Sequence, residues 1–214
     1  MGRDVHPRGP VLPLLALVAV VFVWSAFGPL DRFTWFLEVL PALVGLPLLA
    51  VTYRRFPLTS LAYSLIAAHA VILMVGGHYT YAQVPLFSWI RDTFGLARNH
   101  YDRIGHFAQG FVPAILAREI LLRRTPLRRG GWLVTIVMSI CLAISALYEL
   151  FEWVVAVATG TAADAFLGTQ GDFWDTQKDM AMCLVGAISA LLILSRAHDR
   201  SLFCLVRESH GDRS

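Results

Sequence analysis

The sequence predicts an all-α fold, a polytopic membrane bundle of about six transmembrane helices. Hydrophobic residues make up 57% of the 214-residue chain and charged residues 15%, whereas soluble domains average about 45–50% and about 25%. The apolar residues also gather into runs close to the ~20 residues that cross a hydrocarbon core. These runs cover roughly residues 11–27, 36–53, 58–76, 104–122, 132–157 and 179–196. We predict one integral membrane domain over residues 1–214, because no repeat and no second domain is visible.

The first run favours a retained helix over a cleaved signal peptide. Arg3 and Arg8 precede a long apolar stretch that ends in Trp24-Ser25-Ala26-Phe27. A signal peptide would carry a clear small-x-small cleavage site at this point. We therefore expect this stretch to remain as the first membrane helix.

Two further segments lie outside the spanning runs. Residues 85–97, PLFSWIRDTFGLA, place Leu86, Trp89 and Phe94 near one helical face. This pattern predicts a short helix that lies in the membrane interface. The polar tail after Ser195 is expected to be loosely structured.

Basic residues assign the two membrane faces. Arginines gather at the N-terminus, in alternate connections and in the C-terminal tail: Arg3, Arg8, Arg54, Arg55, Arg123, Arg124, Arg128, Arg129, Arg196, Arg200 and Arg207. The positive-inside rule makes this face, and with it both termini, cytoplasmic. Arg91, Arg98 and Arg103 fall on the opposite side and weaken the assignment. The net charge of +3 reflects helix-end arginines, so we expect membrane lipid and no nucleic acid as a partner.

Two acids share a face of the run 132–157. Glu149 and Glu152 are spaced i,i+3 and therefore lie on one helix face. An acid at the centre of a membrane helix costs at least about 2.5–3.5 kcal/mol, so both side chains are expected to point into the bundle. They could pair with arginines and fix the packing, or they could form a metal site, a proton relay or a substrate contact.

The start of the run 104–122 carries an imidazole beside a carboxylate. Asp102 and His106 are spaced i,i+4, so the carboxylate could orient the imidazole. Asp102 could equally cap the N-terminus of the helix. Before this run, His78 and Tyr79 follow Gly76 and Gly77, which permit a tight turn or a close approach.

The loop before the last run is the densest polar segment. Residues 164–180 contain several acids, and Asp175 and Asp179 are spaced i,i+4. Both could face one way if the last helix begins near Asp175, which could instead serve as its N-cap. A merely solvated acidic loop is the alternative, although this loop is poor in basic residues and rich in glycine and aromatic residues.

These residues can converge near one membrane face. At about 1.5 Å per residue, their levels along the helices differ by no more than about 10 Å. The predicted catalytic residues are His106, Glu149, Glu152, Asp175 and Asp179, and the predicted substrate-binding residues are His78, Tyr79, Asp102, Arg103, Gln170 and Trp174. A divalent metal, Zn²⁺, Mn²⁺ or Mg²⁺, would suit carboxylates with an imidazole. The predicted ligands are His106, Glu149 and Asp175, although no diagnostic motif such as HExxH is present.

Several long motifs resemble a known family. The segments are FGPLDRFTWFLEVLP (27–41), VGGHYTYAQVPL (75–86), ARNHYDRIGHFAQGFVPA (97–114), ISALYELFEW (144–153) and DAFLGTQGDFWDTQKDM (164–180). They resemble the YjdF-type family of bacterial inner-membrane proteins over nearly all of residues 20–195. The resemblance implies a bacterial inner-membrane location and this fold, and it supplies no reaction.

A more distant likeness is to the VanZ-like membrane proteins. Asp102-Arg103-Ile104-Gly105-His106-Phe107 is similar to that family's Asp-Lys-x-x-His-Phe segment, with arginine for lysine. Glu149 is similar to a later helix acid, and Asp175 and Asp179 approximate the loop acid that enters the final helix. Asp179 stands where that family has asparagine, which leaves the equivalence of this position open.

Three functions remain open at this point. The first is a membrane enzyme, a hydrolase or transferase, that acts on a lipid-linked or envelope substrate at the outer leaflet. No serine or cysteine nucleophile is evident, which disfavours an acyl-enzyme route. The second is a small proton- or cation-coupled transporter, and the third is a non-catalytic membrane scaffold. Buried acids fit the transporter, but no inverted repeat is visible.

Overall fold

The computed structural model describes residues 11–160 and 164–211, and these residues form helices and connecting turns. The elements are α1 (Val11–Ala26), α2 (Arg32–Thr52), α3 (Ser60–His78), α4 (Pro85–Phe94), α5 (Tyr101–Arg124), α6 (Gly131–Thr159), α7 (Asp164–Leu167) and α8 (Asp175–Gly211). The predicted all-α fold class is therefore confirmed. The short helix predicted within 85–97 is confirmed as α4, which has no buried residue.

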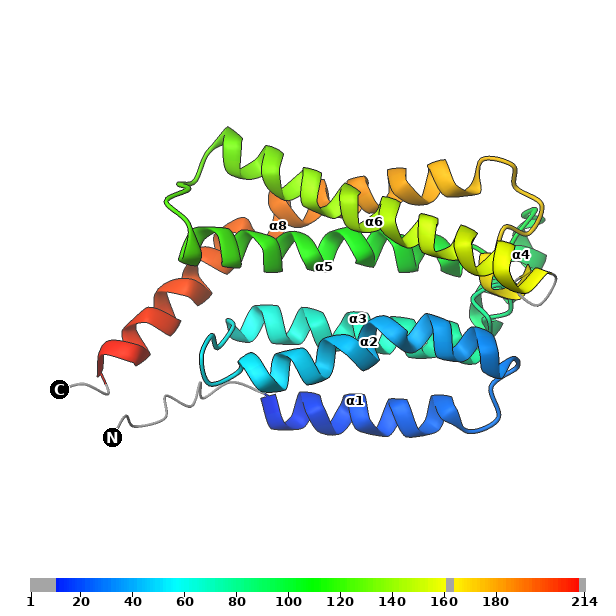
Figure 1. Ribbon diagram of the computed structural model, residues 1–214, viewed down its shortest axis with the longest axis horizontal. Coiled ribbons are helices and arrows are strands. Elements are labelled where there is room, and N and C mark those ends of the chain that lie inside the picture. Colours follow the sequence, from blue (N-terminus) through cyan, green and yellow to red (C-terminus); the bar gives the residue numbers. More distant parts are fainter. Residues whose placement is uncertain (1–10, 161–163, 212–214) are drawn as a thin grey trace.

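The long helices run back and forth along one axis (Figure 1). α1, α2 and α3 form one group, α5, α6 and α8 form the other, and α3 also packs against α5. The connections α1–α2, α3–α5 and α6–α8 gather at one end, which we call the acidic end because Asp102, Asp175 and Asp179 lie there. The connections α2–α3 and α5–α6 lie at the other end, which we call the basic end because it holds Arg54, Arg55 and residues 123–129.

Four helices in the described ranges are long and apolar enough to cross a membrane: α2, α3, α6 and the part of α8 up to Arg207. The apolar helix α1 is shorter, with 16 residues. The 24-residue α5 is too rich in charged residues to qualify by hydropathy. It nevertheless runs the length of the bundle beside α6 and α8 (Figure 1), and its charged residues Arg118 and Glu119 are buried.

The distribution of side chains is that of a protein dissolved in lipid. Large apolar residues on the outer faces are exposed, such as Leu147 and Val157 of α6 and Leu192 of α8. Ionisable side chains lie inside, among them the fully buried Glu119 and His198. Lipid solvates the apolar exterior, and polar groups gather internally because hydrocarbon cannot hydrogen-bond to them. The chain is therefore an integral membrane protein.

The helices α5 and α8 approach so closely that their backbones touch. A Cβ atom on Gly110 would collide with the carbonyl oxygen of Cys183, and one on Gly186 would collide with the carbonyl oxygen of Phe107. Small residues at a membrane helix interface allow this approach, which increases van der Waals contact where no hydrophobic effect drives association. The crossing sets the distance between the two helices that carry His106 and Asp179.

Gly110→Ala is expected to lower the free energy of unfolding by about 1–3 kcal/mol, because the new methyl group overpacks this crossing. Gly45→Ala in α2 is the matched control, since nothing lies within 4 Å of a Cβ there. That substitution is expected to be neutral or to stabilise by up to about 1 kcal/mol through helix propensity. Thermal unfolding in detergent compares the two variants, and equal stabilities would contradict the described crossing.

The C-terminal segment departs from the prediction. The prediction of a loose tail after Ser195 is wrong, because α8 continues as a helix to Gly211. His198, Leu202 and Leu205 are buried along this extension. The polar composition misled the prediction because His198 is paired inside the protein, with its Nε2 atom 3.1 Å from an oxygen of Glu119.

Candidate functional site

The predicted catalytic residues lie together at the acidic end. They come from the start of α5, the second half of α6 and the start of α8, and each is at most 8% exposed: His106, Glu149, Glu152, Asp175 and Asp179. The inward orientation expected for Glu149 and Glu152 is what the structure has. The site is thus a buried cluster of carboxylates around one imidazole.

The imidazole of His106 lies between acids on both sides. Its Nε2 atom is 3.4 Å from Oδ1 of Asp102 and 3.7 Å from Oδ1 of Asp179. Its Nδ1 atom is 3.1 Å from Oε1 of Gln109 and 3.8 Å from Oε1 of Glu149. If Nδ1–H donates to the Gln109 oxygen, Nε2 faces two carboxylates and must hold either a proton or a metal ion.

Asp102, His106 and Asp179 could hold a metal ion. One ligand atom from each lies within 4.8 Å of the other two. In a tetrahedral zinc site with bonds of about 2.1 Å, neighbouring ligand atoms are about 3.4 Å apart. The separations of 3.4 Å and 3.7 Å around His106 Nε2 fit that geometry. Three protein ligands would leave one position for water or substrate, as in catalytic zinc sites.

This set differs from the ligands predicted from the sequence. Asp102 and Asp179, rather than Glu149 and Asp175, lie nearest to His106 Nε2. Asp175 is instead held by two guanidinium groups, those of Arg98 and Arg103. Glu149 lies on the Nδ1 side of the imidazole, where it could exchange a proton with His106 or act through a water.

One buried oxygen in the cluster has no hydrogen-bond partner within the described residues. This atom is Oε1 of Glu149, in a residue that is 8% exposed. A buried acceptor without a partner is costly and calls for a water or an ion. Because the atom lies beside the imidazole of His106, it supports a binding site for a water or an ion at this place.

Two arginines form a layer on the loop side of the imidazole. Arg98 contacts Asp175 and also Asp102, with a distance of 3.1 Å from its Nη2 atom to Oδ2 of Asp102. Arg103 contacts Asp179 and lies 2.5 Å from Asp175 and 3.3 Å from Asp172. Arginine suits this role because its fork of donors can bind several oxygens at once. The ion pairs orient the carboxylates of Asp102 and Asp179 toward His106.

Carboxylates outnumber basic side chains in and around the cluster of His106. The acids are Glu38, Asp102, Glu149, Glu152, Asp172, Asp175 and Asp179, and the bases beside them are Arg98, Arg103 and Lys178. The ammonium group of Lys178, 2.7 Å from Asp172, holds the pKa of that half-buried carboxyl below its usual range. The excess of carboxylates inside the bundle is favourable for a divalent cation.

The loop 168–174 is tied to the start of α5. Arg98 donates to the carbonyl oxygen of Gly168 over 3.1 Å. Gln170 accepts from the backbone N–H of Asn99 and donates to its carbonyl oxygen, over 2.9 Å and 3.0 Å. Gln170, predicted to bind substrate, therefore holds the loop in place, and the 58% exposed Trp174 points away from the protein interior.

The other predicted substrate-binding residues fall in two places. Asp102 and Arg103 belong to the cluster around His106. His78 lies against α1, where its Nδ1 atom is 3.0 Å from the carbonyl oxygen of Ser25 and its ring is 4.5 Å from that of Trp24. Tyr79 packs edge-on against His78. The structure therefore places His78 and Tyr79 in the α1–α3 packing, and Tyr79 also packs beside Tyr81 and Tyr101.

Sequence reasoning missed several residues of the site. Glu38 of α2 is 6% exposed and accepts a hydrogen bond of 3.4 Å from the hydroxyl of Tyr148. An acid inside the apolar run 36–53 was the available signal. Arg98 and Gln109 also complete the cluster, and Tyr81 packs its ring against Gly105, where a Cβ would lie 2.8 Å from the ring.

Comparison with known proteins identifies the family to which the chain belongs. The family model described as "Predicted membrane protein (DUF2238)" matches residues 10–200. The chain belongs to this family. A similar protein is inner membrane protein YjdF of Escherichia coli (strain K12). It is 49% identical over 203 residues, which cover 94% of this chain and 96% of YjdF. No solved structure matches significantly.

These findings confirm the resemblance to the YjdF-type family. The similarity to YjdF extends over nearly the whole chain, so it includes the segments of this chain that carry the buried cluster. The likeness to the VanZ-like proteins stays a prediction. Neither comparison names a reaction.

Proposed function

We propose that this DUF2238 protein is a metal-dependent membrane enzyme, a hydrolase or transferase, that acts on a lipid-linked or envelope substrate. The observation that carries the proposal is the convergence of Asp102, His106 and Asp179 within metal-binding distance inside the membrane bundle. A divalent ion in this position would supply Lewis acidity toward a carbonyl or phosphoryl oxygen. The three ligands come from α5 and α8, whose close crossing keeps them in place.

The remaining residues of the cluster have distinct roles in this proposal. Glu149, with an unpaired oxygen beside His106, would take and return the proton of the attacking group. Glu152, one turn further along α6, would complete the acidic wall. Arg98 and Arg103 would hold the ligand carboxylates and present positive charge toward an anionic headgroup. Asp175 would position both arginines.

The proposed orientation places the site at the outer leaflet of the bacterial inner membrane, with both termini in the cytoplasm. The relative YjdF is named an inner membrane protein, which supports that location. The arginines of the α2–α3 and α5–α6 connections favour the basic end as the cytoplasmic face. The acidic end would then face outward, where an envelope substrate can reach it.

The transporter alternative gains less support. Between His106 and the basic end, the seam of α5, α6 and α8 is filled by side chains with 0% exposure, including Ile115, Cys141 and Cys183. A water or ion path from one face to the other would have to open this packing. The scaffold alternative assigns no role to the convergence of Asp102 and Asp179 on the imidazole of His106.

A lipid and envelope comparison tests the proposed reaction. Cells that lack the protein are complemented with the wild type, with Glu149→Gln or with Asp92→Asn, an exposed control acid outside the cluster. We expect a lipid-linked species to accumulate without the protein, to remain with Glu149→Gln and to disappear with the wild type and Asp92→Asn. An unchanged lipid profile in all strains, or full complementation by Glu149→Gln, would overturn the proposed reaction.

A further inference from the structure

A second buried polar cluster lies at the basic end, far along α5 from His106. Glu119 is 0% exposed, and its two oxygens accept hydrogen bonds from the backbone N–H of Thr59 over 3.0 Å and from its hydroxyl over 2.7 Å. Arg123 adds a contact of 2.6 Å to the same carboxylate. His198 of α8 completes the set, with Nε2 at 3.1 Å from Glu119. The cluster joins the α2–α3 connection, α5 and α8.

The hydrogen bonds of this cluster lead to a surface arginine. Arg118 can only donate, so Nδ1 of His198, 2.8 Å from Arg118, accepts, and Nε2 carries the proton that reaches Glu119. Arg118 also donates to Asp199 over 2.7 Å. Asp199 in turn lies 3.1 Å from Nε of Arg129. The buried network thus holds the side chain of Arg129, which is 61% exposed, at the mouth of the α6–α8 crevice.

Two hollows meet at Arg129. A cavity of about 300 Å³ lies between α6 and α8, with walls that include Leu133, Val134, Met138 and Ile188. A second cavity of about 490 Å³ is lined by Arg123, Arg128 and Arg129 together with Leu122 and Leu202. Arg129 belongs to the lining of both. Arg129 therefore borders both a mostly apolar crevice and a recess lined by arginines.

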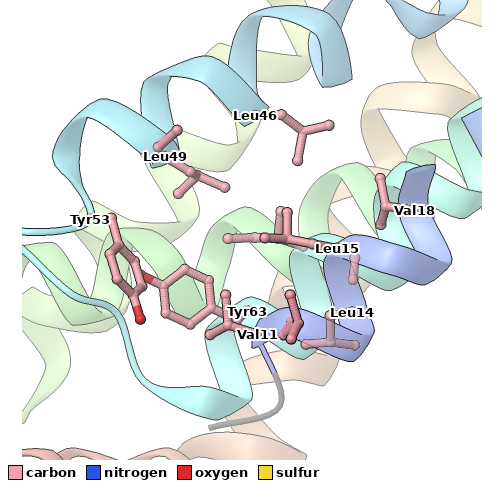
Figure 2. Close-up of a pocket in the computed structure, with 12 residues that line it drawn as sticks. Val11, Leu14, Leu15, Val18, Leu46, Leu49, Tyr53 and Tyr63 are labelled. Carbon is pink, nitrogen blue, oxygen red and sulfur yellow. The ribbon is translucent and has the colours of Figure 1, made fainter. Parts of the chain in front are cut away.

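A third hollow, larger than these two, offers a contrast. It has a volume of about 640 Å³ and lies between α1, α2 and α3. Figure 2 shows Leu15, Leu46, Leu49, Tyr53 and Tyr63 around it. Its lining contains no charged residue. A hydrocarbon chain could enter it, but nothing there distinguishes one headgroup from another.

From these observations we infer that the hollows around Arg129 form a binding site for one anionic phospholipid. The phosphate contacts Arg128 and Arg129, and an acyl chain lies against Val134 and Met138 in the α6–α8 crevice. Guanidinium groups bind phosphate oxygens through paired donors, and basic pockets between membrane helices recognise anionic headgroups. Asp199 engages only Nε of Arg129 in the ion pair described, and a guanidinium has further donors for a phosphate.

Native mass spectrometry of the full chain in detergent tests this site with phosphatidylglycerol as the probe. We expect Arg128→Gln combined with Arg129→Gln to weaken binding about thirtyfold, since each basic residue near an anionic lipid contributes about 1 kcal/mol. Arg54→Gln with Arg55→Gln removes the same charge at the same end, outside both hollows. We expect that control pair to change the affinity less than threefold.

A second variant distinguishes binding in the α6–α8 crevice from a general attraction between the arginines and anionic lipid. Val134→Trp leaves the charge unchanged and fills the crevice from an exposed position on α6. We expect it to weaken phosphatidylglycerol binding about tenfold while thermal unfolding stays like that of the wild type. Equal losses in the two arginine pairs, equal binding of phosphatidylglycerol and phosphatidylcholine by the wild type, or unaltered binding by Val134→Trp would each overturn the site.

Discussion

Replacing Arg103 by alanine is expected to lower the free energy of unfolding by about 3–5 kcal/mol, the usual loss when one partner of a buried ion pair is removed. The side chain is 11% exposed and contacts the carboxylates of Asp172, Asp175 and Asp179. Without it, Asp179 loses its guanidinium contact and lies near Asp102 with less compensating charge. Repulsion between carboxylates therefore adds to the cost of the lost ion pairs.

The protein's own cysteines can report this unfolding. Cys141 and Cys183 are buried, whereas Cys204 is exposed, so a Cys204→Ser background reacts with a thiol dye only when the bundle opens. Arg91→Ala is the matched control, because the Arg91–Asp92 pair is exposed and such pairs contribute about 0–1 kcal/mol. If Arg103→Ala and Arg91→Ala melt at the same temperature, the arginine layer does not stabilise the site.

Zinc is expected to raise the stability of the purified wild type by about 2.7 kcal/mol when the free ion reaches 100 times its dissociation constant. The ion would bind Asp102, His106 and Asp179 in the folded bundle, and the unfolded chain does not bring these residues together. His106→Ala is expected to abolish the stabilisation, because it removes the imidazole that lies between both carboxylates.

His100→Ala is the control for this measurement. His100 precedes α5 and forms its N-cap without a side-chain hydrogen bond, so its removal takes away an imidazole near the site without touching the proposed ligands. We expect it to keep the full zinc response in thermal unfolding at constant pH. A response that survives His106→Ala, or one that is lost equally in both variants, would contradict metal binding at this place.

Much of the fold was readable from the sequence because lipid imposes a simple rule on composition. Long apolar runs mark α2, α3 and α6 closely, since backbone groups in hydrocarbon must be satisfied within a helix. The rule fails where polar residues are paired inside the protein. It misses the end of α8, where His198 is buried against Glu119.

The candidate site was readable in part. Helical spacing brings Asp102 to His106 and Asp175 to Asp179, because residues four apart share a helix face. Spacing within one helix cannot say which acid of α8 lies beside His106, since that depends on the register set by the Gly110–Gly186 crossing. The same limit hid Arg98, whose partner Asp175 is 77 residues away in the chain.

Elemental mass spectrometry of the purified protein tests the metal site most directly. Wild type, Asp179→Asn and Asp175→Asn are purified in parallel, washed free of loose metal and compared for bound zinc, manganese and magnesium. We predict about one divalent ion per chain in the wild type and in Asp175→Asn, and almost none in Asp179→Asn, because Asp179 and not Asp175 lies beside His106 Nε2. A wild type without bound metal, or equal metal content in the two variants, would contradict it.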